Sequence, residues 1–139
     1  MKFQSRLVKV DPGPDWKGYN LNDQQHGRDI SLILGIRLHP KLFLRAGAGY
    51  LNYEGVSGFS VFGELEYRLL KGRLSPTFTL RPGYDRIFNQ YAGGTAGLLF
   101  SPMAGLDFRI NKSWGCYLKT GIQLSQQSLL FPVRLGITR

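Results

Sequence analysis

The chain has 139 residues, enough for one domain, with 18 glycines, 13% aromatic residues and a formal net charge of +9. Its apolar and aromatic content is too high for a disordered chain, and the abundance of glycine excludes a helical bundle. No apolar run is long enough for a transmembrane helix, and the single cysteine, Cys116, excludes an internal disulfide and a cysteine-rich zinc site.

Apolar and polar residues alternate with a period of two along most of the chain, which is typical of β-strands. The segment 29–38 places five aliphatic side chains on one face and Ser31, Gly35 and Arg37 among those on the other. The same alternation recurs in 63–69 and 104–110. We therefore predict one domain, 1–139, with strands at 2–10, 29–39, 42–53, 58–70, 75–87, 95–110, 114–124 and 129–139.

The connections between these strands alternate in length. The short connections are 39–41, 71–74 and 111–113, and the longer ones are 11–28, 54–57, 88–94 and 125–128. Alternate connections of an up-and-down antiparallel sheet lie at the same end. We therefore expect the tight turns and both termini at one end and the longer loops at the other. Prolines within three strands each remove a ladder donor, so we expect bulges or broken pairing at Pro82, Pro102 and Pro132.

The two faces of the predicted strands differ in a way that favours a membrane barrel over a soluble one. Most charges share a face with the glycines, and glycine leaves space for long charged side chains inside a narrow eight-stranded barrel. The opposite face carries no charge in mid-strand, where a charge facing lipid would cost about 2–4 kcal/mol. Aromatic residues on this apolar face collect near the strand ends, as in two interfacial girdles: Tyr50, Tyr67, Tyr84, Phe108 and Trp114.

The hairpin sequence Gly-Leu-Asp-Phe-Arg-Ile, Asn-Lys-Ser-Trp and Tyr-Leu-Lys-Thr-Gly, within 105–121, resembles the tight-turn hairpins of bacterial outer-membrane β-barrels. The resemblance covers nearly the whole chain and is to the OmpA/OmpX-type family of eight-stranded transmembrane barrels. It implies a Gram-negative outer membrane, with the tight turns in the periplasm. Membrane lipid and lipopolysaccharide are the implied surroundings, and another envelope protein is a further candidate partner. The family is functionally mixed, so the resemblance carries no catalytic residue onto this chain.

Charged side chains on the glycine-rich face are expected to fill the lumen of this barrel. Buried charges persist only when they are paired, and eight strands leave room for side chains rather than a pore. We therefore favour a plug of salt bridges over an ion gate or anion site. The predicted network consists of Arg37, Arg45, Glu64, Glu66, Arg81, Asp107, Arg109, Lys119 and Arg134, with Arg68 on the same face.

The loop 11–28 is the most distinctive connection. Trp16 and Tyr19 are aromatic residues of the kind that anchor binding partners, or that fold back on the barrel rim. His26 lies near aspartates in the sequence, and Ser57 and Ser125 are expected in loops at the same end. A histidine, a serine and an aspartate are the residue types that acyl transfer on lipid A would need. No local motif fixes that geometry, so the prediction is no catalytic residue. We also expect no cofactor, no metal site and no nucleic-acid partner.

The sequence thus predicts a small outer-membrane barrel with a structural, adhesion-like or accessory role. No signal peptide is recognisable after Met1, so we expect the export signal of such a protein to have been removed. Two alternatives remain open at this point. One is a lipid-modifying acyl-transfer enzyme of the outer membrane, and the other is a soluble lipocalin-like barrel that binds an apolar ligand.

Overall fold

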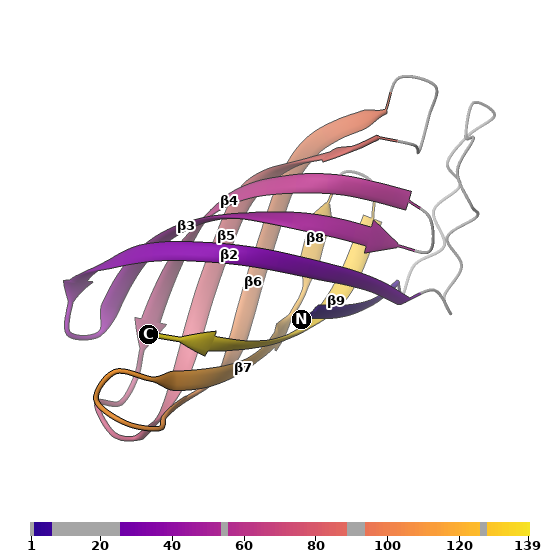
Figure 1. Ribbon diagram of the computed structural model, residues 1–139. Coiled ribbons are helices and arrows are strands. Elements are labelled where there is room, and N and C mark those ends of the chain that lie inside the picture. Colours follow the sequence, from indigo (N-terminus) through magenta and orange to yellow (C-terminus); the bar gives the residue numbers. More distant parts are fainter. Residues whose placement is uncertain (1, 7–25, 54–55, 89–93, 126–127) are drawn as a thin grey trace.

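The computed structural model describes residues 2–6, 26–53, 56–88, 94–125 and 128–139, and in these ranges every regular element is a β-strand (Figure 1). The strands are β1 (Lys2–Arg6), β2 (His26–His39), β3 (Leu42–Tyr53), β4 (Val56–Arg68), β5 (Leu74–Ile87), β6 (Thr95–Arg109), β7 (Gly115–Gly121), β8 (Gln123–Ser125) and β9 (Ser128–Thr138). No helix in the described ranges is long and apolar enough to cross a membrane.

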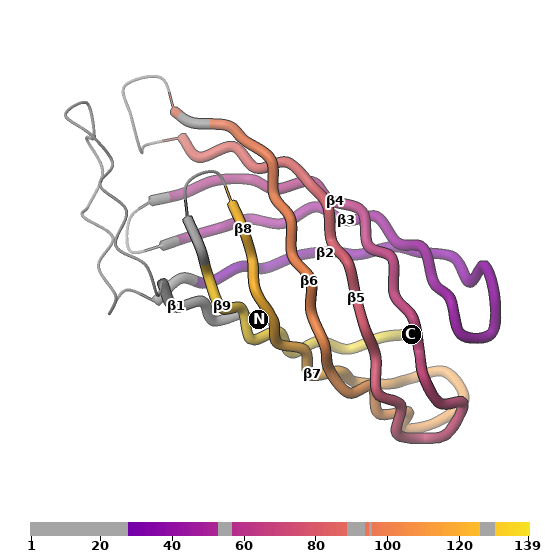
Figure 2. The backbone as a smooth tube through the Cα atoms, turned by 180° about the vertical axis from the view of Figure 1, so that it is seen from behind, coloured from indigo at the N-terminus to yellow at the C-terminus, as the bar shows by residue number. Residues whose placement is uncertain are grey.

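All the strands belong to one antiparallel sheet in which neighbours in sequence are mostly neighbours in space. β7 and β8 both pair with β6 and β9, and only Ile122 separates them, so they are two halves of one strand. The described ranges therefore contain eight antiparallel strands, which confirms the predicted all-β fold and strand number. β1 pairs with both β2 and β9, and the strongly curved sheet is thereby partly closed (Figure 2).

Two prolines explain the break between β7 and β8. Pro102 in β6 and Pro132 in β9 lie on the two strands that flank Ile122, and the ladder is interrupted beside both. The Ile122 amide donates to the Pro102 carbonyl at 3.1 Å, but Pro102 has no N–H to return. The hydroxyl of Ser101 donates to the Ile122 carbonyl at 3.0 Å instead, so this carbonyl keeps a hydrogen bond.

Pro82 has a similar but milder effect on the ladder between β4 and β5. Pairing stops opposite Arg81 and Pro82 and resumes with the same register on either side. The expected local loss of pairing is thus present at all three prolines. A true register shift is found elsewhere, in the ladder between β2 and β3 close to the tight turn, at Arg37 and His39.

The N-terminal strand differs from the prediction. Lys2 lies opposite both Asp29 and Arg134, far from the tight turn that follows His39. The C-terminal strand does reach the tight-turn end, where Thr138 pairs with Gly115. The expectation that both termini lie at that end is therefore correct for the C-terminus and wrong for the N-terminus. Alternation assigns a strand's faces, but its position along its neighbours depends on register, which the alternation does not encode.

The position of β1 leaves a seam in the sheet, defined here as the space between residues 30–38 of β2 and 135–138 of β9. On the seam side, neither edge pairs with another strand in the described part of the chain. A cavity of about 1200 Å³ opens along the seam and is lined by residues of both edges. Where the seam meets β1, only the width of one strand separates β2 from β9, because Lys2 pairs with both of these strands.

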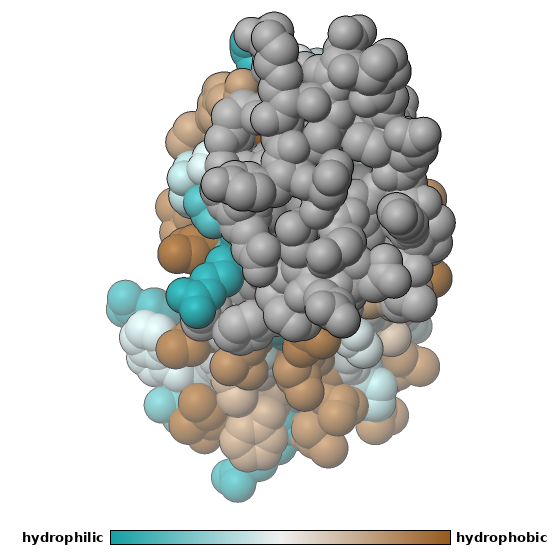
Figure 3. All heavy atoms as spheres, turned by 90° about the vertical axis from the view of Figure 1, so that its right-hand side faces the viewer, coloured by the Kyte–Doolittle hydropathy of each residue, from teal (hydrophilic) through white to brown (hydrophobic). Residues whose placement is uncertain are grey.

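The polarity of the sheet is the reverse of that of a soluble domain. Aliphatic side chains of the outer face are largely exposed, with Ile30 at 70% and Leu98 at 80%, whereas Glu66 on the inner face is completely buried. Viewed from the loop end, apolar side chains cover much of the visible outer surface beside the grey atoms (Figure 3). Buried charged side chains of the sheet therefore occupy the place where a soluble protein has its apolar core.

Hydrogen exchange should detect the seam. In the protein folded in detergent, we expect amides of β2 between Ile30 and Leu38 to alternate between fast and slow exchange. Every second amide points toward the seam, while the others are bonded to β3. Residue-resolved exchange measured by NMR checks this expectation, with β4 as the control because it is paired on both sides. Uniform protection along β2 would contradict a free edge.

Candidate functional site

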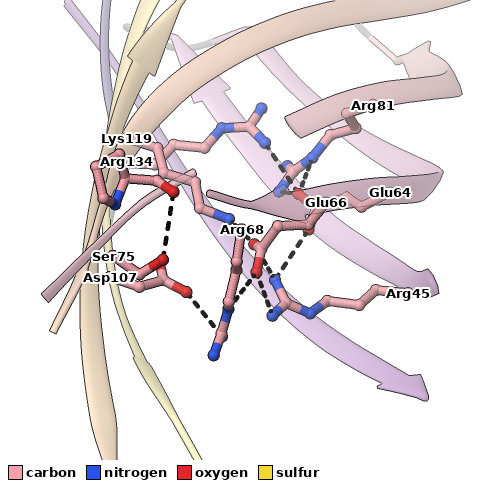
Figure 4. A network of polar contacts seen from close by, with 10 residues as sticks. Arg45, Glu64, Glu66, Arg68, Ser75, Arg81, Asp107, Lys119 and Arg134 are labelled. Carbon is pink, nitrogen blue, oxygen red and sulfur yellow. Dashed lines mark hydrogen bonds and ion pairs between the residues drawn. The ribbon is translucent and has the colours of Figure 1, made fainter. Parts of the chain in front are cut away.

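The described site residues centre on the carboxylate of Glu66, on the inner face of β4. Arg45 of β3 donates two hydrogen bonds to it, at 2.5 and 2.9 Å. The Nε of Arg68 donates at 3.2 Å, and the ammonium group of Lys119 in β7 also donates to it. Glu66 is fully buried, so three cations from three strands compensate one carboxylate that water does not reach (Figure 4).

Glu64 forms a second centre two residues earlier on the same face of β4. The Nε of Arg81 in β5 donates to its Oε1 at 2.5 Å, and Nη2 of the same guanidinium also contacts this oxygen. Nη1 atoms of Arg45 and Arg134 lie 3.9 and 3.8 Å from the Glu64 carboxylate. Because Arg45 contacts both glutamates, the two centres form one network.

Asp107 extends this network to β6. Its carboxylate lies 2.7 Å from Nη2 of Arg68, whose Nε already bonds Glu66. On the opposite side, Arg134 donates to the side-chain oxygen of Gln123 at 2.9 Å. The network therefore links side chains from most of the strands around the sheet and contains more cations than carboxylates. Its charged members are Arg45, Arg68, Arg81, Lys119, Arg134, Glu64, Glu66 and Asp107.

Aromatic rings on the inner face support the surplus of cations. The guanidinium of Arg81 lies 3.8 Å from the ring centroid of Phe62, and that of Arg68 lies 4.3 Å from the centroid of Phe43. The ammonium of Lys119 lies 4.8 Å from the Tyr117 ring centroid. A cation over an aromatic face is attracted by the ring quadrupole, and more strongly where water is excluded. These rings were not predicted, although Phe43 lies two residues before Arg45 and Phe62 two residues before Glu64, so that each shares a face with its charged neighbour.

Glycines make room for the cations. A Cβ atom at Gly35 would collide with the side chain of Arg45, and one at Gly105 would lie 2.6 Å from Cγ of Lys119. The charged side chains thus lie directly against neighbouring backbone. This is the physical reason why glycine shares a face with charge in the sequence.

Two predicted network members lie apart from the rest. The side chains of Arg37 and Arg109 are exposed near the tight turns, and neither forms an ion pair with any residue that the structure describes. Arg37 lies over the Phe43 ring, with its guanidinium carbon 5.3 Å from the centroid. The other seven predicted members come together inside the sheet, and Arg68 joins them.

The loop residues singled out in the sequence are placed only in part. Trp16 and Tyr19 lie outside the described residues, and His26 is the first residue of β2 rather than part of a loop. Ser57 is the second residue of β4 rather than part of a loop, and its hydroxyl accepts hydrogen bonds from Tyr50 and Asn52, at 3.0 and 3.2 Å. Ser125 is at the end of β8 rather than in a loop, and its hydroxyl donates to the Asp85 carboxylate. In the described ranges no group of three or more histidine, cysteine or acidic residues could hold a metal.

Comparison of the chain with protein-family models, with curated proteins and with solved structures finds no match. The functional assignment is therefore carried by the geometry of the sheet and its buried charges.

The pairing of Glu64 with Arg81 can be tested by a double-mutant cycle. Removing one partner of a buried ion pair typically costs about 3–5 kcal/mol, so Glu64→Gln should lower the free energy of unfolding substantially. Arg81→Gln should cost clearly less in the Glu64→Gln background than in the native protein. Urea titration in detergent, followed by tryptophan fluorescence, measures both changes.

The matched control for this cycle is Arg37→Gln, since Arg37 has no ion pair with the described residues. Its effect should simply add to that of Glu64→Gln. Strict additivity for Arg81→Gln as well would show that the Glu64–Arg81 contact contributes no coupling energy.

Proposed function

We propose that this chain is a small eight-stranded transmembrane β-barrel of a Gram-negative outer membrane, with a lumen plugged by charged side chains. Its role in this proposal is structural, adhesion-like or accessory, and it has no enzymatic activity. The observation that carries the proposal is the inverted polarity of the sheet, with apolar side chains exposed outside and ion pairs buried inside.

The outer face supports this proposal because it is apolar over several strands. Large aliphatic side chains of β2, β6 and β9 are exposed, among them Leu34, Leu106 and Leu135. Each Å² of apolar surface in water costs about 25 cal/mol, and monomeric soluble proteins rarely expose wide apolar patches. Contact with lipid removes this cost.

Aromatic side chains at both ends of the sheet fit the two interfaces of a bilayer. Tyr67 and Trp114 are half-exposed near the tight turns. At the other end Tyr50, Phe59 and Phe88 pack edge to face, with centroid distances of 5.5 and 5.7 Å. Trp and Tyr are enriched at membrane–water interfaces, where one part of the ring system is apolar and the other polar.

The soluble lipocalin-like alternative is less well supported by the interior. A site for an apolar ligand needs a predominantly apolar lining, with a few polar groups for orientation. The described inner face instead carries buried charges that form ion pairs, Arg81 with Glu64 and Lys119 with Glu66.

The acyl-transfer alternative needs a hydroxyl held by a base. Ser57 accepts hydrogen bonds from Tyr50 and Asn52, and Ser125 donates to a carboxylate. None of these described contacts places a histidine on a serine hydroxyl, and the proposal therefore assigns no catalytic residue.

Site-specific labels test which face meets lipid. In a Cys116→Ser background, single cysteines at Leu34, Ala104, Leu106 and Leu118 should carry fluorophores that lipid-borne quenchers reach and aqueous iodide does not. These four positions are exposed on the apolar face. Fluorescence quenching in reconstituted vesicles provides the measurement.

A cysteine at Lys112, in a tight turn, is the matched control for these labels and should be quenched by iodide. If iodide quenches the four apolar positions as strongly as the label at residue 112, the membrane assignment is wrong.

The proposal that this chain is an outer-membrane barrel is tested by comparing the electrophoretic mobility of boiled and unboiled protein. Unboiled protein in detergent should migrate differently from boiled protein, because a closed barrel resists unfolding by dodecyl sulfate at room temperature. A monomer that stays soluble without detergent and shows one mobility would overturn the proposal.

A further inference from the structure

The tight-turn end of the sheet contains a second, smaller cavity of about 180 Å³, which borders the ion-pair network at Arg68. Its basic lining residues come from separate places in the chain: the end of β2, the end of β4, the turn before β5 and the end of β6. They are Arg37, Arg68, Lys71 and Arg109. No carboxylate lines this cavity. We call it the basic mouth.

The Phe43 ring lies beneath two of these cations, Arg68 and Arg37, and beneath Arg45 of the ion-pair network. Guanidinium carbons of Arg68, Arg37 and Arg45 lie 4.3, 5.3 and 5.5 Å from its centroid. Phe43 is buried, so its ring offers a fixed apolar surface on which the guanidinium groups gather. The guanidinium groups of Arg68 and Arg45 are paired with carboxylates, so the charge at this ring that a bound anion would compensate is that of Arg37.

The network supplies counter-charge for only some of these groups. Arg68 forms ion pairs with Asp107 and Glu66, and Arg45 forms one with Glu66. Arg37 and Arg109 form no ion pair with the described part of the chain. The basic mouth therefore carries uncompensated positive charge on side chains that present planar, forked donors.

We propose that the basic mouth binds a phosphate-type oxyanion, either free or as the phosphate of a larger headgroup. Guanidinium forks match phosphate oxygens in pairs, and a tetrahedral anion can accept from several cations that converge from different strands. The cavity volume corresponds to about six water molecules, which leaves room for such an anion and some of its hydration. This inference goes beyond the proposed function and does not depend on it, since it rests on the mouth alone.

Calorimetric titration tests the inference on the full chain folded in a non-ionic, phosphate-free detergent. One arm titrates inorganic phosphate, and the other titrates dihexanoyl-phosphatidylglycerol below its own micellar concentration. The two arms distinguish the sources of the phosphate. Equal affinity assigns the site to the oxyanion itself, and clearly tighter binding of the lipid assigns it to a headgroup.

The decisive variant is Arg37→Gln with Arg109→Gln, which removes two charges from the lining. Its matched control is Arg73→Gln with Lys112→Gln, which removes two charges at the same end but outside the lining of the mouth. The lining variant should bind phosphate at least about tenfold more weakly, because it loses charge-assisted hydrogen bonds. The control variant should stay within about twofold of the native protein, the change expected from an exposed charge outside the site.

Two results would overturn the inference. Equal loss of binding in both double variants would show only diffuse attraction to a basic surface, and no heat of binding at millimolar concentrations of either probe would show that no site exists. Unfolding midpoints measured in the same detergent identify any variant that has lost its fold. In that event the single variants Arg37→Gln and Arg109→Gln replace the double one, and each should weaken phosphate binding more than Arg73→Gln does.

Discussion

The buried carboxylate of Glu66 is the constraint on which the rest of the sheet depends. An ionised group without water is tolerated only if opposite charges reach it, and here Arg45, Arg68 and Lys119 do so from β3, β4 and β7. Strands that are far apart in sequence must therefore curve toward one point. The partial closure of the sheet and the burial of its charges both follow from this requirement.

This requirement also explains the composition of the inner face. Long cations directed at one centre need space beside the backbone, and glycines such as Gly35 and Gly105 provide it where a Cβ would collide with Arg45 or Lys119. Cations that outnumber carboxylates need other stabilisation, and Phe43 and Phe62 supply ring faces for it. Glycine, arginine and aromatic residues thus recur together because glycine leaves space for the long cations and the aromatic rings stabilise their charge.

The sequence predicted the strands and their faces well, because a period of two is local and repeats in every strand. The bounds of β3 are the predicted ones, 42–53, and Glu64 and Glu66 are buried on the face that the alternation gives them. The partners within the network were not predicted, since they depend on how neighbouring strands are staggered. Register also decides how deep β1 lies, which is why its position beside Asp29 was missed.

The seam is a direct result of the register of β1. Elsewhere in the sheet the inner-face residues are mostly buried, but Ser31 and Gly35 along the seam are exposed. Hydrocarbon cannot hydrogen-bond a free strand edge, so in the proposed bilayer setting the edge at residues 30–38 of β2 needs hydrogen-bond partners. In the part of the chain whose side chains are described, the ion pairs of Glu66 come from β3, β4 and β7, and none comes from β2. The described ion pairs of Glu66 therefore lie on strands away from the edge of β2, and they do not depend on what covers that edge.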